Sequence, residues 1–96
     1  MPMKNLPDSR EHEYVKRMTH RAISKLGLQV EESDWDKLNR KYMVRVTEQS
    51  SGKTHVVRIG QALVERCMTD RKDDQIISEI FRQVREGFPE LSAGRP

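Results

Sequence analysis

The sequence is poor in cysteine and in aromatic residues, and it contains no long apolar segment. Cys67 is the only cysteine among 96 residues, so no disulfide can form within the chain, which favours a reducing compartment such as the cytosol. No apolar run approaches the roughly 18 residues that a transmembrane helix needs. The amino-terminal sequence MPMKNLPDS also lacks the apolar core of a signal peptide. We therefore predict a cytoplasmic protein that does not contact a membrane.

Sequence signals for catalysis and for cofactors are also missing. The three histidines, His12, His20 and His55, have neither the i, i+4 spacing nor the cysteine partners of a zinc site. No glycine-rich phosphate loop and no nucleophile elbow is present. Cys67 falls on an apolar stripe, which is typical of a packed side chain. These absences predict a protein that holds no metal and no cofactor, and they favour a binding protein over an enzyme.

Composition predicts one small domain with a thin core. Hydrophobic and charged residues each make up 34% of the chain, whereas charged residues make up about a quarter of an average globular protein. A domain of this length buries a modest core, which dimerisation would enlarge. We place the domain at residues 9–88, between flexible tails at residues 1–8 and 89–96. The net charge of +3 is mildly basic.

Apolar residues spaced by three and four positions predict helices. The first covers residues 9–26 and stops at Gly27, because glycine suits a left-handed helix end. A second, short helix is predicted over residues 31–42, with Ser33 as its N-cap. Three residues form its buried side: Trp35, Leu38 and Tyr42. A helix over residues 73–88 has the clearest apolar stripe, formed by Ile76, Ile77, Ile80, Phe81, Val84 and Phe88.

Residues 42–59 alternate with a period of two, which predicts a β-hairpin. A two-residue turn at residues 51–52 would place Arg45 directly opposite Arg58. Four apolar residues then share the inner face of the hairpin: Val44, Val46, Val57 and Ile59. Four others share the outer face: Arg45, Thr47, Val56 and Arg58.

The segment after the hairpin permits two interpretations. The leading one is helical, and it gives an α+β fold with an N-terminal helix, a short helix, an antiparallel β-hairpin and a C-terminal helix. The helices would cover the apolar face of the sheet. The alternative adds strands at residues 62–68 and 75–81.

Two arginines on the outer face of the hairpin are the first candidate for a binding site. Like charges directly opposite each other destabilise a sheet by a few tenths of a kcal/mol to about 1 kcal/mol. An anion from a partner would relieve this repulsion, and the planar guanidinium group suits that role. We predict that Arg45, Arg58 and nearby Lys53 bind a protein or nucleic acid with a negative surface. The alternative is that the arginines are solvated, or neutralised by Glu65 or Glu79.

The polar side of the first predicted helix is the second candidate. It carries five basic residues: Lys16, Arg17, His20, Arg21 and Lys25. Such a side can follow a phosphate backbone. Aromatic residues make up only 5% of the chain, so stacking on single-stranded bases is not predicted. The alternative is a solvated helix face, which is the most frequent role of such a charge run.

Two runs of the sequence are similar in rhythm to a known family. THRAISKLGLQVEESDWDKL and SSGKTHVVRIGQALVERCMTDRKDDQIISEIF, within residues 19–81, resemble small phage- and plasmid-borne proteins of the barnase/RelE-like ribonuclease-toxin fold. The resemblance implies a helix packed on an antiparallel meander, with strands at LVERCMTD and QIISEIF. It also implies metal-independent RNA cleavage by a cluster of basic and histidine side chains. The matching residues are Arg45, His55, Arg58 and His20.

We therefore expect a small non-enzymatic regulatory protein of bacterial or phage type, which binds an anionic partner through the hairpin and the basic helix. Two alternatives stand beside this expectation. One is the ribonuclease toxin. The other is a structural homodimer with a seam of exposed apolar residues: Met43, Val56 and Met68.

Overall fold

The computed structural model describes residues 9–89 and has an α+β fold. The elements follow in the order α1 (Ser9–Ile23), β1 (Leu28–Asp36), β2 (Lys41–Glu48), β3 (Thr54–Gly60), α2 (Gln61–Asp70) and α3 (Asp73–Gly87). The predicted fold class is thereby confirmed. The tails predicted at residues 1–8 and 89–96 lie, apart from Pro89, outside the described residues.

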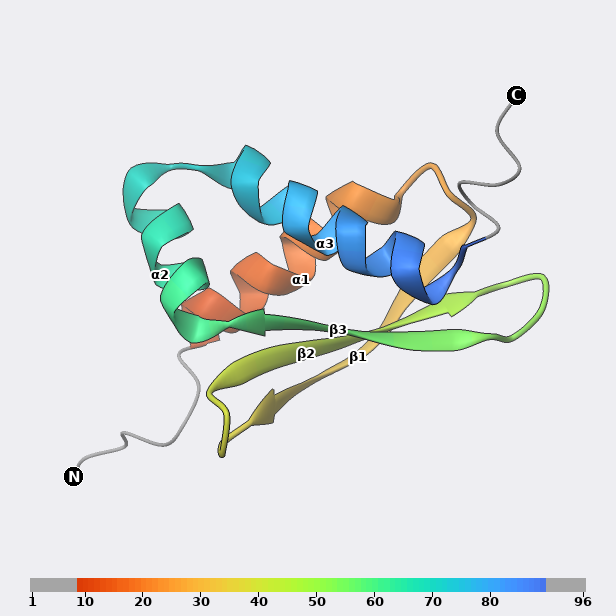
Figure 1. Ribbon diagram of the computed structural model, residues 1–96, viewed down its shortest axis with the longest axis horizontal. Coiled ribbons are helices and arrows are strands. Elements are labelled where there is room, and N and C mark those ends of the chain that lie inside the picture. The colour runs from red at the N-terminus through yellow and green to blue at the C-terminus, as the bar shows by residue number, and fades with distance from the viewer. Residues whose placement is uncertain (1–8, 90–96) are drawn as a thin grey trace.

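The three strands form one antiparallel meander in the order β1-β2-β3, and the helices lie on one side of it (Figure 1). We call the side against the helices the inner face and the other side the open face. The core lies between the inner face and the apolar stripes of α1 and α3, because burying both in one layer removes the most apolar surface from water. Its fully buried members include Val15, Tyr42, Val44, Val46, Val57, Ile59, Ile76, Ile80 and Val84.

Helix α1 has the predicted apolar stripe but is one turn shorter than predicted. It ends at Ile23, and residues 24–27 form a turn. Gly27 has a φ of 73°, a left-handed conformation that glycine adopts without steric cost. Lys25 therefore lies in the turn and not on the helix with Lys16, Arg17, His20 and Arg21.

The short helix predicted over residues 31–42 is wrong, because most of this segment belongs to strands β1 and β2. A β-bulge between Val30 and Ser33 inserts an extra residue into β1, so its inward-facing residues are spaced two, three and two apart: Leu28, Val30, Ser33 and Trp35. The three-residue step imitates helical spacing. Leu38, which the helical pattern predicts as buried, lies in the β1–β2 turn and is 89% exposed.

The hairpin of β2 and β3 is present, but its register differs from the prediction by two residues. Glu48 pairs with Lys53 across a four-residue loop, with hydrogen bonds from Glu48 N–H to Lys53 C=O at 2.8 Å and from Gly52 N–H to Glu48 C=O at 2.8 Å. Arg45 is therefore opposite Val56, and Arg58 is opposite Met43. The predicted direct Arg45–Arg58 pair is wrong. A shift of two leaves every residue on its predicted face, because side chains alternate with period two.

The chain after β3 is helical, so the alternative with strands at residues 62–68 and 75–81 is wrong. Helix α2 ends at Asp70 and is capped by Arg71, whose φ of 56° and ψ of 47° are left-handed. Near the end of α3, Gly87 lies so close to the His55 ring that a Cβ atom there would meet it at 2.2 Å. Within residues 9–89, no helix is both long and apolar enough to cross a bilayer.

One carboxylate is buried where α1, β2 and α2 meet. Glu11 Oε1 accepts hydrogen bonds from the Tyr42 hydroxyl at 2.5 Å and from Gln61 Nε2 at 3.2 Å. Beside it, the His12 ring packs on Tyr42 with ring centroids 5.3 Å apart, and its buried Nε2 has no hydrogen-bond partner in the described part of the chain. Burial, aided by the charge of Lys16, lowers the pKa of His12 and favours neutral imidazole.

Candidate functional site

The open face of the sheet carries a shallow hollow of about 230 Å³. All three strands contribute to its lining: Glu32 and Asp34 from β1, Met43 and Arg45 from β2, and Val56 and Arg58 from β3. The residues lie in two cross-strand rows. In one row Asp34 pairs with Met43 and Met43 with Arg58, and in the other Arg45 pairs with Val56 beside the bulge of β1. The period-two pattern therefore brings both predicted arginines to one site.

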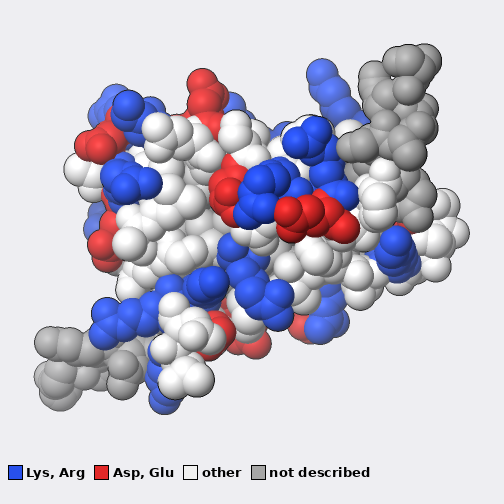
Figure 2. Space-filling model, in the orientation of Figure 1, with Lys and Arg blue, Asp and Glu red and all other residues white. Residues whose placement is uncertain are grey.

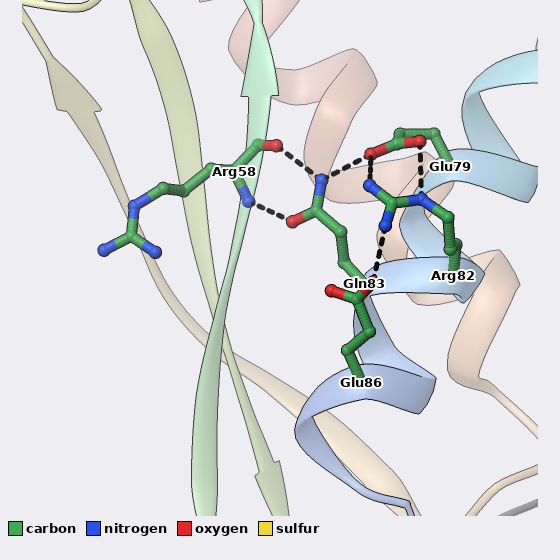
Figure 3. A network of polar contacts seen from close by, with 5 residues as sticks. All are labelled: Arg58, Glu79, Arg82, Gln83 and Glu86. Carbon is green, nitrogen blue, oxygen red and sulfur yellow. Dashed lines mark hydrogen bonds and ion pairs between the residues drawn. The ribbon is translucent and has the colours of Figure 1, made fainter.

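The backbone of Arg58 is hydrogen-bonded to helix α3, while its side chain is exposed to solvent. The Gln83 side chain on α3 accepts from Arg58 N–H at 2.8 Å and donates to Arg58 C=O at 2.8 Å. Figure 3 shows the Arg58 side chain pointing away from this contact and from α3. No carboxylate among residues 9–89 lies within 4.0 Å of its guanidinium. Arg58 therefore presents an exposed positive charge.

Arg45 is only partly compensated within the chain. Its Nη1 lies 3.9 Å from Glu32 Oε1, and the two side chains are 50% and 75% exposed. An exposed ion pair at that distance contributes little to stability. Glu79, one of the two carboxylates expected to neutralise the arginines, instead binds Arg82 at 2.6 Å on α3 (Figure 3). It forms no ion pair with Arg45 or Arg58. The other, Glu65, is exposed on α2.

Sequence reasoning missed the acidic side of this site. Glu32, Asp34 and Asp36 are on β1, which the sequence pattern predicts as a helix, so their position beside the arginines was not predicted. Asp36 accepts hydrogen bonds from the Asn39 side chain and N–H at 2.9 and 3.1 Å. These bonds, and to a smaller extent the charge of Arg58, lower the pKa of Asp36. The open face thus has an acidic strand at one edge and basic residues on the other two strands.

The centre of the open face is apolar. Met43 and Val56 are each half-buried between the charged side chains. They are two of the three residues expected in a homodimer seam. The third, Met68, is on α2 and packs against the core from the helix side of the molecule. The structure therefore brings Met43 and Val56 together but not Met68.

The structure places Lys53 and His55 away from the two arginines. His55 pairs with Val46 on the inner face, where its ring packs against Gly87 and edge-on to Phe88 with centroids 6.3 Å apart. Lys53 Nζ lies 5.6 Å from the centroid of the Phe88 ring. The histidine and arginine cluster that the toxin resemblance implies is thus divided between two faces of the sheet, with His20 on α1.

The basic residues of α1 line a second hollow, of about 450 Å³. Its lining comprises Glu13, Lys16, Arg17, His20, Arg21, Val30 and Glu31. Because α1 packs on the inner face, this hollow and the arginines of the open face lie on opposite sides of the sheet. The β1 bulge divides two adjacent carboxylates between them, with Glu31 in this hollow and Glu32 in the other.

Some of the charge on α1 is already used in packing against α3. Arg21 Nη1 lies 3.5 Å from Asp73 Oδ2, and the Tyr14 hydroxyl donates to Asp73 Oδ1 at 2.6 Å. Burial, together with this hydrogen bond to a carboxylate, raises the pKa of Tyr14. Figure 2 shows acidic and basic side chains interspersed over the upper part of the view, where the helices lie, and a run of basic side chains along its lower left.

Neither a metal centre nor a reactive thiol is assembled by the described residues. Residues 9–89 hold no group of three or more His, Cys, Asp or Glu side chains placed to bind a metal ion. Cys67 is fully buried, and burial raises the pKa of its thiol, which disfavours the nucleophilic thiolate. No known protein family, curated protein or solved structure matches the chain.

Proposed function

We propose that this chain is a small, non-enzymatic regulatory protein that binds an acidic protein surface through the open face of its sheet. The observation that carries the proposal is the exposed Arg58 guanidinium, which has no carboxylate within 4.0 Å in the described chain and stands beside half-buried Met43 and Val56. An apolar centre with an arginine at its border is a typical composition for a protein interface.

The charges of the open face favour a protein partner over a nucleic acid. Glu32, Asp34 and Asp36 border the arginines, and they would repel a phosphate backbone at close range. A protein surface can instead present isolated carboxylates to Arg58 and polar groups to β1. If a nucleic acid binds, the basic hollow of α1 offers the better surface. We propose the cytosol as its compartment, on the strength of the single, buried Cys67.

RNA cleavage is the second candidate function, and one observation favours it. A helix packed on an antiparallel meander, which the toxin resemblance implies, is present, but the strands that the resemblance implies at LVERCMTD and QIISEIF are helices α2 and α3. The position of His55 counts against it, because its ring is packed between β3 and the end of α3 on the inner face. A ribonuclease would degrade RNA in the presence of EDTA and would lose that activity on His55→Ala.

The test is affinity capture from a lysate of the source cells with matched baits. The baits are the wild-type chain, Arg58→Glu, and Arg66→Glu as an exposed control arginine on α2, each with and without nuclease treatment. We expect a protein that survives nuclease treatment, is retained by the wild type and by Arg66→Glu, and is lost from Arg58→Glu. If Arg58→Glu retains the same proteins as the wild type, the proposal is wrong. Retention that nuclease abolishes would move the binding surface to nucleic acid.

A further inference from the structure

We infer that the acidic surface recognised by the open face is the β1 strand of a second copy of this chain, in a two-fold symmetric dimer. The inference rests on the proposed function and names its partner. It follows from how opposite charges are arranged across one row of the sheet, as set by the strand register.

That row is Asp34, Met43 and Arg58, in the order acidic, apolar, basic. Neighbouring strands are roughly 4.8 Å apart, so the backbones at Asp34 and Arg58 are about 10 Å apart with Met43 between them. Neither charged side chain has an ion-pair partner within 4.0 Å among the described residues. The Asp34 carboxylate makes a local hydrogen bond, in which Oδ1 accepts from Trp35 N–H at 2.7 Å. The register thus places two opposite charges on the two sides of Met43, neither with an ion-pair partner within 4.0 Å among residues 9–89, although the charge of Arg58 also acts on Asp36.

A second copy can satisfy both charges at once. If two open faces meet about a two-fold axis that runs along β2 over Met43, β1 of each copy lies over β3 of the other. Asp34 of each copy then meets Arg58 of the other, and the two Met43 side chains meet on the axis. A two-fold interface requires such self-complementarity, because the same patch serves both partners. The Asp34–Met43–Arg58 row has it.

Arg45 is expected to oppose this arrangement by repulsion, and its substitution therefore distinguishes a second copy from an unrelated partner. The axis along β2 also brings the two Arg45 side chains near each other, and among residues 9–89 each is compensated only by its own Glu32 at 3.9 Å. In a dimer, Arg45→Met should therefore strengthen association by removing repulsion. For an unrelated acidic partner, the same substitution should weaken binding. The sign of the effect separates the two kinds of partner.

The decisive experiment reverses the charges singly and then mixes the variants. Sedimentation velocity of the full chain, from about 1 µM to 1 mM, measures the dimer dissociation constant. We expect the wild type to dimerise, and Asp34→Arg and Arg58→Asp each to raise the dissociation constant at least about tenfold. An equimolar mixture of the two variants should dimerise again. In the mixed dimer, position 34 of each chain carries the charge opposite to that at position 58 of the other chain, so both cross-chain contacts are attractive.

The matched controls are Asp70→Arg and Arg66→Asp, an exposed acid and base on α2, which should leave the dissociation constant unchanged. Circular dichroism is used to check that each variant is folded. A wild-type chain that stays monomeric throughout overturns the inference, and so does a dimer that is indifferent to both reversals or a mixture that stays monomeric. A monomeric chain whose captured protein is still lost from Arg58→Glu would overturn only the dimer and leave the proposed function standing.

Discussion

The two faces of the sheet are built from the same strands and have different compositions. Val44, Val46, Val57 and Ile59 on the inner face are essentially inaccessible to solvent. Their neighbours on the open face are charged or half-buried, and several lack an ion-pair partner in the described chain. The helices therefore cover the inner face, and the open face is exposed and accessible to a partner. Substitutions on the two faces should change different measurements.

The largest expected difference is between two adjacent residues of β3. Val57→Asp puts a carboxylate into the sealed core, which costs several kcal/mol, against a total stability of about 5–15 kcal/mol for a typical domain. We expect this variant to be unfolded by circular dichroism. Val56→Asp points to the open face between Arg45 and Arg58 and should stay folded. Equal effects would show that the two faces are not distinct.

The buried carboxylate of Glu11 provides the next test. Tyr42→Phe removes a hydrogen bond to this group at 2.5 Å, and we expect a loss of about 1.5–3 kcal/mol in the free energy of unfolding in urea. Tyr14→Phe is the matched control, because its acceptor Asp73 is half-exposed and can be hydrated instead. Tyr14→Phe should lower the free energy of unfolding by less than Tyr42→Phe does. A larger loss for Tyr14→Phe would contradict the conclusion that the Glu11 carboxylate is the more deeply buried acceptor.

The contact between Gly87 and His55 gives a third, smaller effect. A Cβ atom at Gly87 would overlap the imidazole of His55, so Gly87→Ala should lower the free energy of unfolding by about 1–3 kcal/mol. The higher helix propensity of alanine offsets part of this loss. Gly60→Ala is the control, since its Cβ would meet nothing within 4 Å and its φ is −66°. The double variant Gly87→Ala/His55→Ala should recover stability relative to Gly87→Ala. Additive losses in the double variant would rule out a steric cause.

The smallest effect is on the pH dependence of stability. Folding lowers the pKa of His12 from its ordinary 6.5. As the pH falls, His12 is therefore protonated in the unfolded chain before it is protonated in the folded chain, which favours unfolding. Stability should thus be retained above about pH 6.5 and decline as the pH falls toward the folded pKa. His12→Gln should flatten this decline, measured as urea midpoints between about pH 7.5 and pH 5. His20→Gln, exposed on the same helix, should leave the decline in place.

The sequence allowed the α+β class, both amphipathic helices and the face of every hairpin residue to be predicted, because apolar periodicity determines which side is buried. It did not allow β1 to be predicted. The bulge at residues 31–32 changes the spacing of inward residues from two to three, and the acidic residues there also resemble a helix start. The hairpin register was missed by two because loop length, which burial does not determine, fixes cross-strand pairing.

The candidate site was predictable only in part, for the same reasons. Arg45 and Arg58 share a face, as the period-two pattern predicts. Their acidic neighbours Glu32 and Asp34 come from the misassigned strand, so the opposite charges that define the site could not be read from the hairpin alone. The basic residues of α1 were predicted as a group, but only the packing of α1 on the inner face shows that they are separated from the arginines.

The amide of Gln83 has a consequence for how copies of this chain can meet. By occupying both the N–H and the C=O of Arg58, it closes β3 to an incoming strand at that point, much as a paired neighbour would. At the opposite border, a bulge and a row of carboxylates make β1 a poor template for strand addition. Growth of the sheet into a continuous ribbon of many chains is thereby opposed at both borders.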